Sequence, residues 1–153
     1  MTLPTIVSTK YNNDSSAFRL CKAQREGQET MEYFTVSVPT GTVITSTVGL
    51  VPFRAGARFN YNSVIRNGAL GGTATATLGY IYDDNINNTN NQTAFITTPV
   101  AVSTAGATLS GSNVDAGMGW KATGDGWIVV TIQGTTTGTT NPISGQITMT
   151  YDQ

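Results

Sequence analysis

The stretch GWKATGDGWIVVTI, residues 119–132, holds both tryptophans of the chain, one on each side of a glycine-rich turn. After the turn, Ile128, Val130 and Ile132 alternate with other side chains. This period of two is typical of a β-strand that buries one face. The stretch therefore predicts an antiparallel hairpin in an all-β protein.

The length of the turn decides where the two tryptophans point. A three-residue loop over Gly124–Gly126, with Asp-Gly at its end, suits a type I turn followed by a left-handed glycine. This odd length puts Trp120 on the face of Ile128 and Val130, and Trp127 on the opposite face. We therefore expect Trp120 in the core and Trp127 pointing outward.

An outward Trp127 has three explanations that the sequence leaves open. It packs under a neighbouring loop or the N-terminal segment, it contacts a subunit or partner, or it stacks on a sugar. Tryptophan is enriched at protein interfaces, which favours the second explanation over the third.

Working outward, the chain alternates between short apolar-polar runs and clusters of Gly, Pro, Asn and Ser. Strands are expected at 32–38, 42–51, 58–67, 73–82, 94–103, 114–121, 127–133 and 143–151. About eight short strands without a long helix are typical of a β-sandwich, a jelly roll or a small barrel. We predict a single-domain antiparallel β-sandwich or jelly roll.

The inward positions of these strands form the predicted core. Its members are Val36, Val38, Val43, Phe59, Tyr61, Leu78, Trp120, Ile128, Val130, Ile132, Ile147 and Met149.

Residues 1–31 have no sustained period and carry charges of both signs. They are expected to form an extended N-terminal arm, and residues 32–153 the β-domain. Such a segment gains little from packing on its own domain, so its order should depend on partner contacts. Leu3, Ile6 and Phe18 are spaced so that short pieces of the arm can dock in grooves or add a strand to a sheet edge.

Composition excludes several classes of protein. The chain has 153 residues, a formal net charge of −1, and only 11% charged residues, against a typical quarter. It lacks the clustered basic face that nucleic acid requires. No apolar run is long enough to span a bilayer, and we expect no signal peptide. Cys21 is the single cysteine, so no intrachain disulfide is expected. A surface so poor in charge suits burial against other proteins.

Catalytic chemistry is not indicated. There is no histidine, which excludes Ser-His, Cys-His and His-ligated metal sites. Asp83, Asn85 and Asn87 match the first ligands of a calcium loop, but Asn88 and Ala94 stand where its glycine and glutamate belong. We expect no enzyme activity, no cofactor, no metal and no small-molecule substrate, and we expect loop 83–92 to be exposed and mobile.

The basic residues are unevenly distributed, with seven of the eight in the first 66 residues. Arg54, Arg58 and Arg66 bracket the stretch around the third predicted strand. They form either a solvated face or a polar anchor on an acidic protein surface.

The segment LVPFRAGARFNYNSVIRNGALGGTATATLGYIYDD (50–84) resembles small virion proteins of tailed bacteriophages, in which a P-x-G-A-R-type turn leads to an alternating strand that ends in L-G-Y. The segment GDGWIVVTIQGTTTGTTNPISGQITMTYDQ (124–153) is similar to their closing hairpin. Within that group the chain is most like a head decoration, or cement, protein. The resemblance implies a trimeric β-fold with an extended N-terminal arm.

The resemblance and the composition together predict a structural virion protein, made in the host cytoplasm, that binds the outer surface of the phage head. Its expected partners are the major capsid protein and further copies of itself, as a trimer, with no nucleic acid or membrane. The candidate contact residues are Leu3, Ile6, Phe18, Arg19, Arg54, Arg58 and Trp127. The alternative is a phage tail or fibre module that binds a host glycan through Trp127 and the Asn-rich loop.

Overall fold

The computed structural model describes residues 4–7, 29–60, 62–106 and 119–151. Within these residues the chain forms nine strands and no helix, so none of this part offers a helix that could cross a membrane. The strands are β1 (Ile6–Val7), β2 (Glu29–Val38), β3 (Thr47–Phe53), β4 (Ala57–Phe59), β5 (Val64–Asn67), β6 (Thr75–Tyr82), β7 (Asn91–Ala101), β8 (Gly126–Gln133) and β9 (Asn141–Tyr151).

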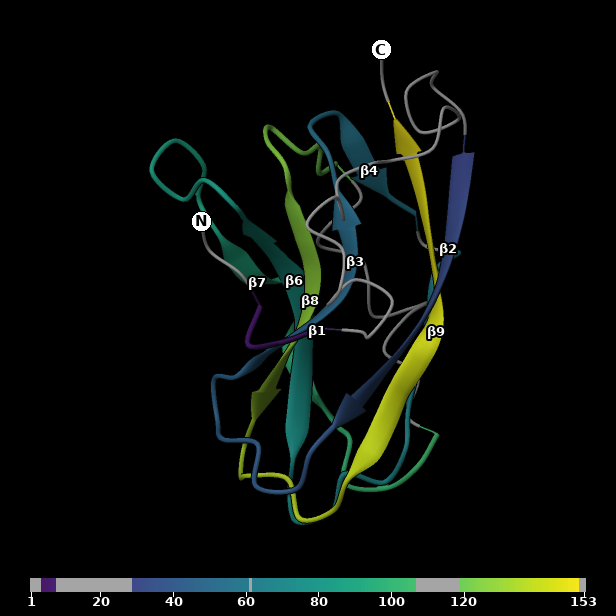
Figure 1. Ribbon diagram of the computed structural model, residues 1–153, viewed down its shortest axis with the longest axis vertical. Coiled ribbons are helices and arrows are strands. Elements are labelled where there is room, and N and C mark those ends of the chain that lie inside the picture. The colour runs from purple at the N-terminus through teal and green to yellow at the C-terminus, as the bar shows by residue number, and fades with distance from the viewer. Residues whose placement is uncertain (1–3, 8–28, 61, 107–118, 152–153) are drawn as a thin grey trace.

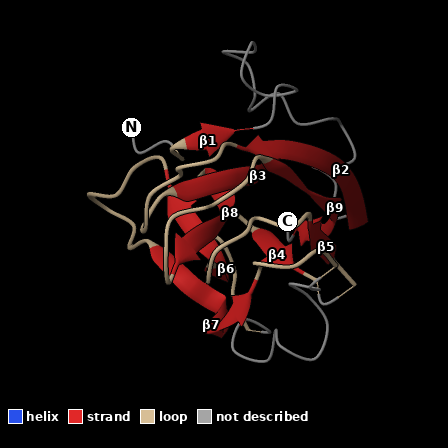
Figure 2. Ribbon diagram, turned by 90° about the horizontal axis from the view of Figure 1, so that it is seen from below, coloured by secondary structure: helices blue, strands red, loops and turns tan. Residues whose placement is uncertain are grey.

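The strands form two sheets that stack as a sandwich (Figures 1 and 2). The first sheet has the order β1-β3-β8-β6-β7, and all its pairs are antiparallel except β1 with β3. In the second sheet β9 pairs with β2 on one side and with β4 and β5 on the other, all antiparallel. The expected all-β sandwich is confirmed.

The core lies between the sheets because the strands alternate as the sequence predicts. In β2, Phe34, Val36 and Val38 are buried, whereas Thr35 and Ser37 between them and Met31 and Tyr33 before them are exposed. Strand β3 is buried along its whole length, and the central strand β8 is buried except for its last residue. Strands buried on both faces read as continuous apolar runs rather than as alternations.

Most of the predicted core is confirmed. The buried members are Val36, Val38, Phe59, Leu78, Ile128, Val130, Ile132, Ile147 and Met149. Trp120 is half-buried and packs against this cluster, so the prediction that it is mostly buried is wrong in degree. Tyr61 lies outside the described residues.

Val43 was expected inside and is 59% exposed, so that prediction is wrong. The expected strand 42–51 begins only at Thr47, because a turn precedes it in which the Ser46 amide donates to the Val43 carbonyl. Thr45 adopts a φ of 72°, a left-handed conformation that no strand residue takes.

Two other expected strands differ from the structure. The expected strand 58–67 is divided into β4 and β5 by a turn in which the Ser63 amide donates to the Asn60 carbonyl. Of the expected strand 114–121, residues 119–121 are turn and coil, and the rest lie outside the described residues. No hairpin therefore joins Trp120 to Trp127.

The N-terminal segment touches both sheets. Ile6 and Val7 of β1 run parallel to Val48 and Gly49 at the edge of the first sheet. Glu29 to Met31, which the sequence assigned to the arm, are the first residues of β2. Leu3, Phe18, Arg19 and Cys21 lie outside the described residues, as does most of the arm.

Candidate interaction surfaces

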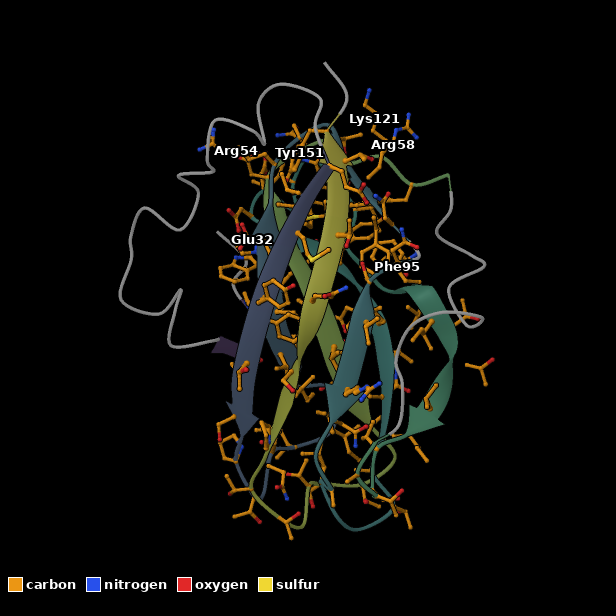
Figure 3. The ribbon with its side chains drawn as sticks, turned by 90° about the vertical axis from the view of Figure 1, so that its right-hand side faces the viewer. Glu32, Arg54, Arg58, Phe95, Lys121 and Tyr151 are labelled. Atoms are coloured by element: carbon orange, nitrogen blue, oxygen red, sulfur yellow. The ribbon has the colours of Figure 1, made fainter. Side chains whose placement is uncertain are left out.

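The two ends of the sandwich differ in charge. We call "charged end" the end formed by the start of β2, residues 53–58, 82–91, 119–126 and the end of β9. The described part of the chain has nine charged side chains, and all except Arg66 lie at this end or in the strand turns next to it. They are Glu29, Glu32, Arg54, Arg58, Asp83, Asp84, Lys121 and Asp125. Figure 3 shows Arg54, Arg58 and Lys121 around Tyr151.

The turn between β3 and β4, beside the two arginines, is held by hydrogen bonds to Ala122 and Asp125. The Ala55 amide donates to the Asp125 carboxylate (3.1 Å), and the Gly56 amide donates to the Ala122 carbonyl (2.8 Å). The Ala122 amide in turn donates to the Ala57 carbonyl (2.8 Å). Gly56 has a φ of 88°, a conformation that glycine adopts without strain. Arg54 and Arg58 are thus half-exposed groups, on and directly after a fixed turn.

The pKa values of two neighbouring aspartates at the charged end shift in opposite directions. Desolvation raises the pKa of the Asp83 carboxyl above its ordinary value, and the nearby Asp125 carboxylate raises it further. Asp84 is fully exposed, and hydrogen bonds from the Asn87 side chain and the Ile86 amide lower its pKa. Burial also raises the pKa of the Tyr151 phenol, which therefore stays neutral.

A cluster of aromatic rings packs beneath the loops of the charged end, between these loops and the core. Trp120 stacks on Tyr80 with ring centroids 4.8 Å apart, and meets Phe53 and Phe95 edge to face at 5.2 and 5.3 Å. Phe95 also stacks on Phe59 of the other sheet at 4.4 Å, which joins the two layers. Since its ring packs against three other rings, Trp120 has a structural role, and it is no sugar platform.

Trp127 lies on the outer face of the first sheet, opposite Ile128 and Val130, as the alternation along β8 requires, although the hairpin from which its direction was predicted does not form. It is nevertheless only 3% exposed and packs in a separate small cluster with Ile81 and Val129. This burial agrees with the first of the three explanations for an outward Trp127, packing under a neighbouring loop or the N-terminal segment. Pro4, which is buried, lies beside Trp127 and Gly49, so the N-terminal segment contributes to the cover.

The Asn-rich loop 83–90 bonds to itself and to its neighbours. The Tyr82 amide donates to the Asn90 side chain (2.7 Å), and the Thr123 hydroxyl donates to the Asn88 side chain (2.6 Å). Ile86 is 90% exposed, as expected of this loop, whereas Asn91 and Gln92 belong to β7. Nowhere in the described residues do three acidic or thiol side chains gather as metal ligands would.

The opposite end carries no charge. We call "threonine end" the loops 39–46, 68–74, 102–106 and 134–140. Threonine hydroxyl groups of these loops form hydrogen bonds with backbone amide and carbonyl groups. The buried Thr137 hydroxyl accepts from the Thr42 amide (3.0 Å) and donates to the Pro39 carbonyl (2.7 Å).

A further pair of threonines ties two of these loops together. The Thr73 amide and hydroxyl both donate to the Thr135 hydroxyl, at 3.2 and 3.3 Å. Val43 and Ile44 are exposed at the tip of this end.

Two exposed apolar side chains that the sequence analysis missed lie on the outer face of the second sheet. Met31 is 51% and Tyr33 66% exposed, and Tyr33 stands opposite Gln146 and thus in one row with Val64. The signal was present in the alternation of β2, because every second position must face outward when Phe34 and Val36 face inward.

The candidate contact residues do not form one patch. Arg54 and Arg58 lie at the charged end, whereas Ile6 and Trp127 lie on the edge and outer face of the first sheet. The remaining three, Leu3, Phe18 and Arg19, are outside the described residues.

Comparison with known proteins bears on the fold alone. No protein-family model matches the sequence, and no curated protein matches it significantly. Among solved structures, a chain in the capsid of Ralstonia phage GP4 superposes with a TM-score of 0.64 at 14% identity, over 83% of this chain and 86% of that chain. A chain in the capsid asymmetric unit of cyanophage Pam1 superposes with a TM-score of 0.62 at 18% identity, over 92% and 99%. This chain therefore has a β-sandwich fold that also occurs in the capsids of two bacteriophages.

Proposed function

We propose that this chain is a structural virion protein of a tailed phage that binds the outer surface of the head and stabilises it. The observation that carries the proposal is the fold similarity to chains of two phage capsids, which extends over nearly the whole of each chain. The protein needs no catalytic group for this role.

The charged end is the proposed anchor on the major capsid protein. Arg54 lies on a turn that is fixed by three hydrogen bonds, Arg58 lies in β4 directly after this turn, and Lys121 lies at the same end. Fixed positive groups favour an acidic partner surface, where charge complementarity mainly sets specificity and the rate of association. The N-terminal arm adds contacts of its own, through Leu3, Ile6, Phe18 and Arg19.

Assembly of several copies, as a trimer, strengthens attachment. Each further copy that binds a lattice of identical sites does so at high effective concentration, so modest single contacts give stable attachment.

The test is co-sedimentation of the purified protein with phage heads that lack it. The wild-type chain should sediment with the heads, and binding should weaken as salt rises, because salt screens exposed charge pairs. Arg58→Glu combined with Lys121→Glu should weaken binding at least tenfold. Arg66→Glu, which changes an exposed arginine on the second sheet, is the matched control and should bind normally.

Absence of binding to heads would contradict the proposal. Saturable binding to host-surface glycans in the same preparation would favour the tail or fibre alternative. The burial of Trp127 speaks against a sugar contact at this residue and leaves the Asn-rich loop as the other contact of that alternative.

A further inference from the structure

The outer face of the first sheet holds a slot that receives the N-terminal segment. Its floor is Gly49 of β3 and its wall is the ring of Trp127 in β8. A methyl group placed on Gly49 would come within 2.4 Å of Pro4 Cγ and 3.1 Å of Trp127 Cε3. Because real Cβ atoms do not approach so closely, Pro4 occupies space that only glycine leaves open.

Hydrogen bonds fix the segment beside the slot. The Thr5 amide donates to the Thr47 hydroxyl (3.1 Å), and the Thr47 amide donates back to the Thr5 hydroxyl (3.4 Å). Ile6 then pairs with Val48, and Val7 with Gly49, in parallel register. The slot thus recognises a short extended segment by shape, by hydroxyl pairing and by a strand ladder.

None of these contacts requires that the segment belong to the same chain. In the slot the segment contacts β3 and β8, and its strand β1 also lies close to β2. The segment is joined to β2 along the chain only through residues 8–28. A stretch of that length can span roughly 70 Å when extended, at about 3.3–3.6 Å per residue. Exchange of an identical element between copies preserves every contact, so it carries little free-energy cost.

The segment pairs with only part of the free edge of β3. Among the described residues, Val48 and Gly49 have strand partners on this side of β3, and Leu50 to Phe53 have none. An edge with free backbone groups accepts an added strand readily.

We propose that in the assembled protein the slot of Gly49 and Trp127 is filled by residues 4–7 of a second copy of this chain, so that exchanged N-terminal strands link neighbouring subunits. Copies held side by side bring a neighbour's segment to an effective concentration comparable with that of the chain's own. The inference rests on the proposed function in that copies must lie close together.

Thr5 and Thr47 provide a covalent test, because their hydroxyl oxygens are 3.4 Å apart and a disulfide at these positions would need little backbone movement. Two variants, Thr5→Cys and Thr47→Cys, are made in a Cys21→Ser background, which removes the natural thiol. They are mixed, added to heads, oxidised and separated on a denaturing gel. Each single variant oxidised alone shows any disulfides between like thiols, so a band that appears only in the mixture requires a segment that crosses between copies.

One control uses a second pair of threonines at a similar distance, and two further controls are glycine substitutions. Thr73→Cys and Thr135→Cys, whose hydroxyl oxygens are 3.3 Å apart within the body of the domain, should cross-link in the double variant and not in the mixture of single variants. Adding Gly49→Ala to the Thr47→Cys chain should abolish the inter-chain disulfide, since the new methyl group occupies the space of Pro4. Gly119→Ala, at a glycine with nothing within 4 Å, should leave it unchanged.

We expect the mixture to give a dimer band that is weaker than the inter-chain cross-linking of the Thr5→Cys/Thr47→Cys double variant, because only junctions that pair a Thr5→Cys segment with a Thr47→Cys slot can react. If the double variant cross-links only within one chain while the protein co-sediments with heads, strand exchange is wrong and attachment stands. If the protein does not attach to heads, the same mixture is oxidised at millimolar concentration in free solution. A dimer band there supports the exchange, and its absence overturns it.

Discussion

The charged end and the threonine end of the sandwich are built by different forces. At the charged end, loops rest on a packed cluster of aromatic rings and place eight charged groups around it. At the threonine end, hydroxyl groups bond to backbone and no charged side chain is present. The stability of the protein should therefore depend on packing, pH and salt through the charged end, and on individual hydrogen bonds through the threonine end.

The largest effect is expected from Phe53→Ala at the charged end. Phe53 is fully buried and meets Tyr82 and Trp120 edge to face at 5.6 and 5.2 Å. Removing the ring leaves a cavity, so the free energy of unfolding should fall by about 3–5 kcal/mol. Denaturant unfolding measures this. Tyr33→Ala, which removes a ring that is 66% exposed, should cost far less, and equal losses would contradict the packing argument.

A smaller loss is expected from Thr137→Val at the threonine end. The change keeps the shape of the buried side chain but leaves the Thr42 amide without its acceptor. An unsatisfied buried donor costs about 1–3 kcal/mol. Thermal unfolding of this variant should be compared with that of Thr136→Val at the neighbouring exposed position. If the two variants melt alike, the hydroxyl network does not hold this end.

Two aspartates at the charged end should respond to pH with opposite signs. The pKa of Asp83 is raised in the folded state. Above the unfolded pKa of about 4 the folded protein therefore loses stability as Asp83 ionises, whereas the protonated carboxyl has no such effect. The pKa of Asp84 is lowered, so its ionised form adds stability above that pH, which is lost as pH falls through the folded pKa.

Asp83→Asn should therefore raise the melting temperature at pH 7, and Asp84→Asn should lower it. Both differences from the wild-type chain should shrink as the pH falls toward 3. Melting curves between pH 3 and pH 8 measure this, and shifts of the same sign in the two variants would contradict the assignment.

The smallest effect is expected from Val43→Thr at the tip of the threonine end. Since Val43 is 59% exposed, the change should alter the free energy of unfolding by less than about 0.5 kcal/mol, as surface substitutions usually do. Val48→Thr, the same change at a fully buried position of β3, should cost clearly more. A large loss from Val43→Thr would mean that this tip is covered.

Much of the fold could be predicted from the sequence, because alternation is a local property. The runs that became β2 and β9 show one buried face within a few residues, whereas β6 and β8 are buried along nearly their whole length. Where the prediction failed, as at Thr45, the local chain allowed a strand. A turn replaced it because the Thr45 amide could donate to the Ile132 carbonyl (2.8 Å), far along the chain.

The sequence by itself determined an all-β chain, most of its core and the face of the sheet to which Trp127 belongs. Only the tertiary structure decided that Trp127 is buried, because the buried Pro4 beside it is distant in sequence and no local pattern links the two. It also decided that Arg54, Lys121 and Asp125 share one end, since antiparallel pairing brings turns together that are far apart along the chain. Period and composition act over a few residues, whereas surfaces are formed by contacts between distant segments.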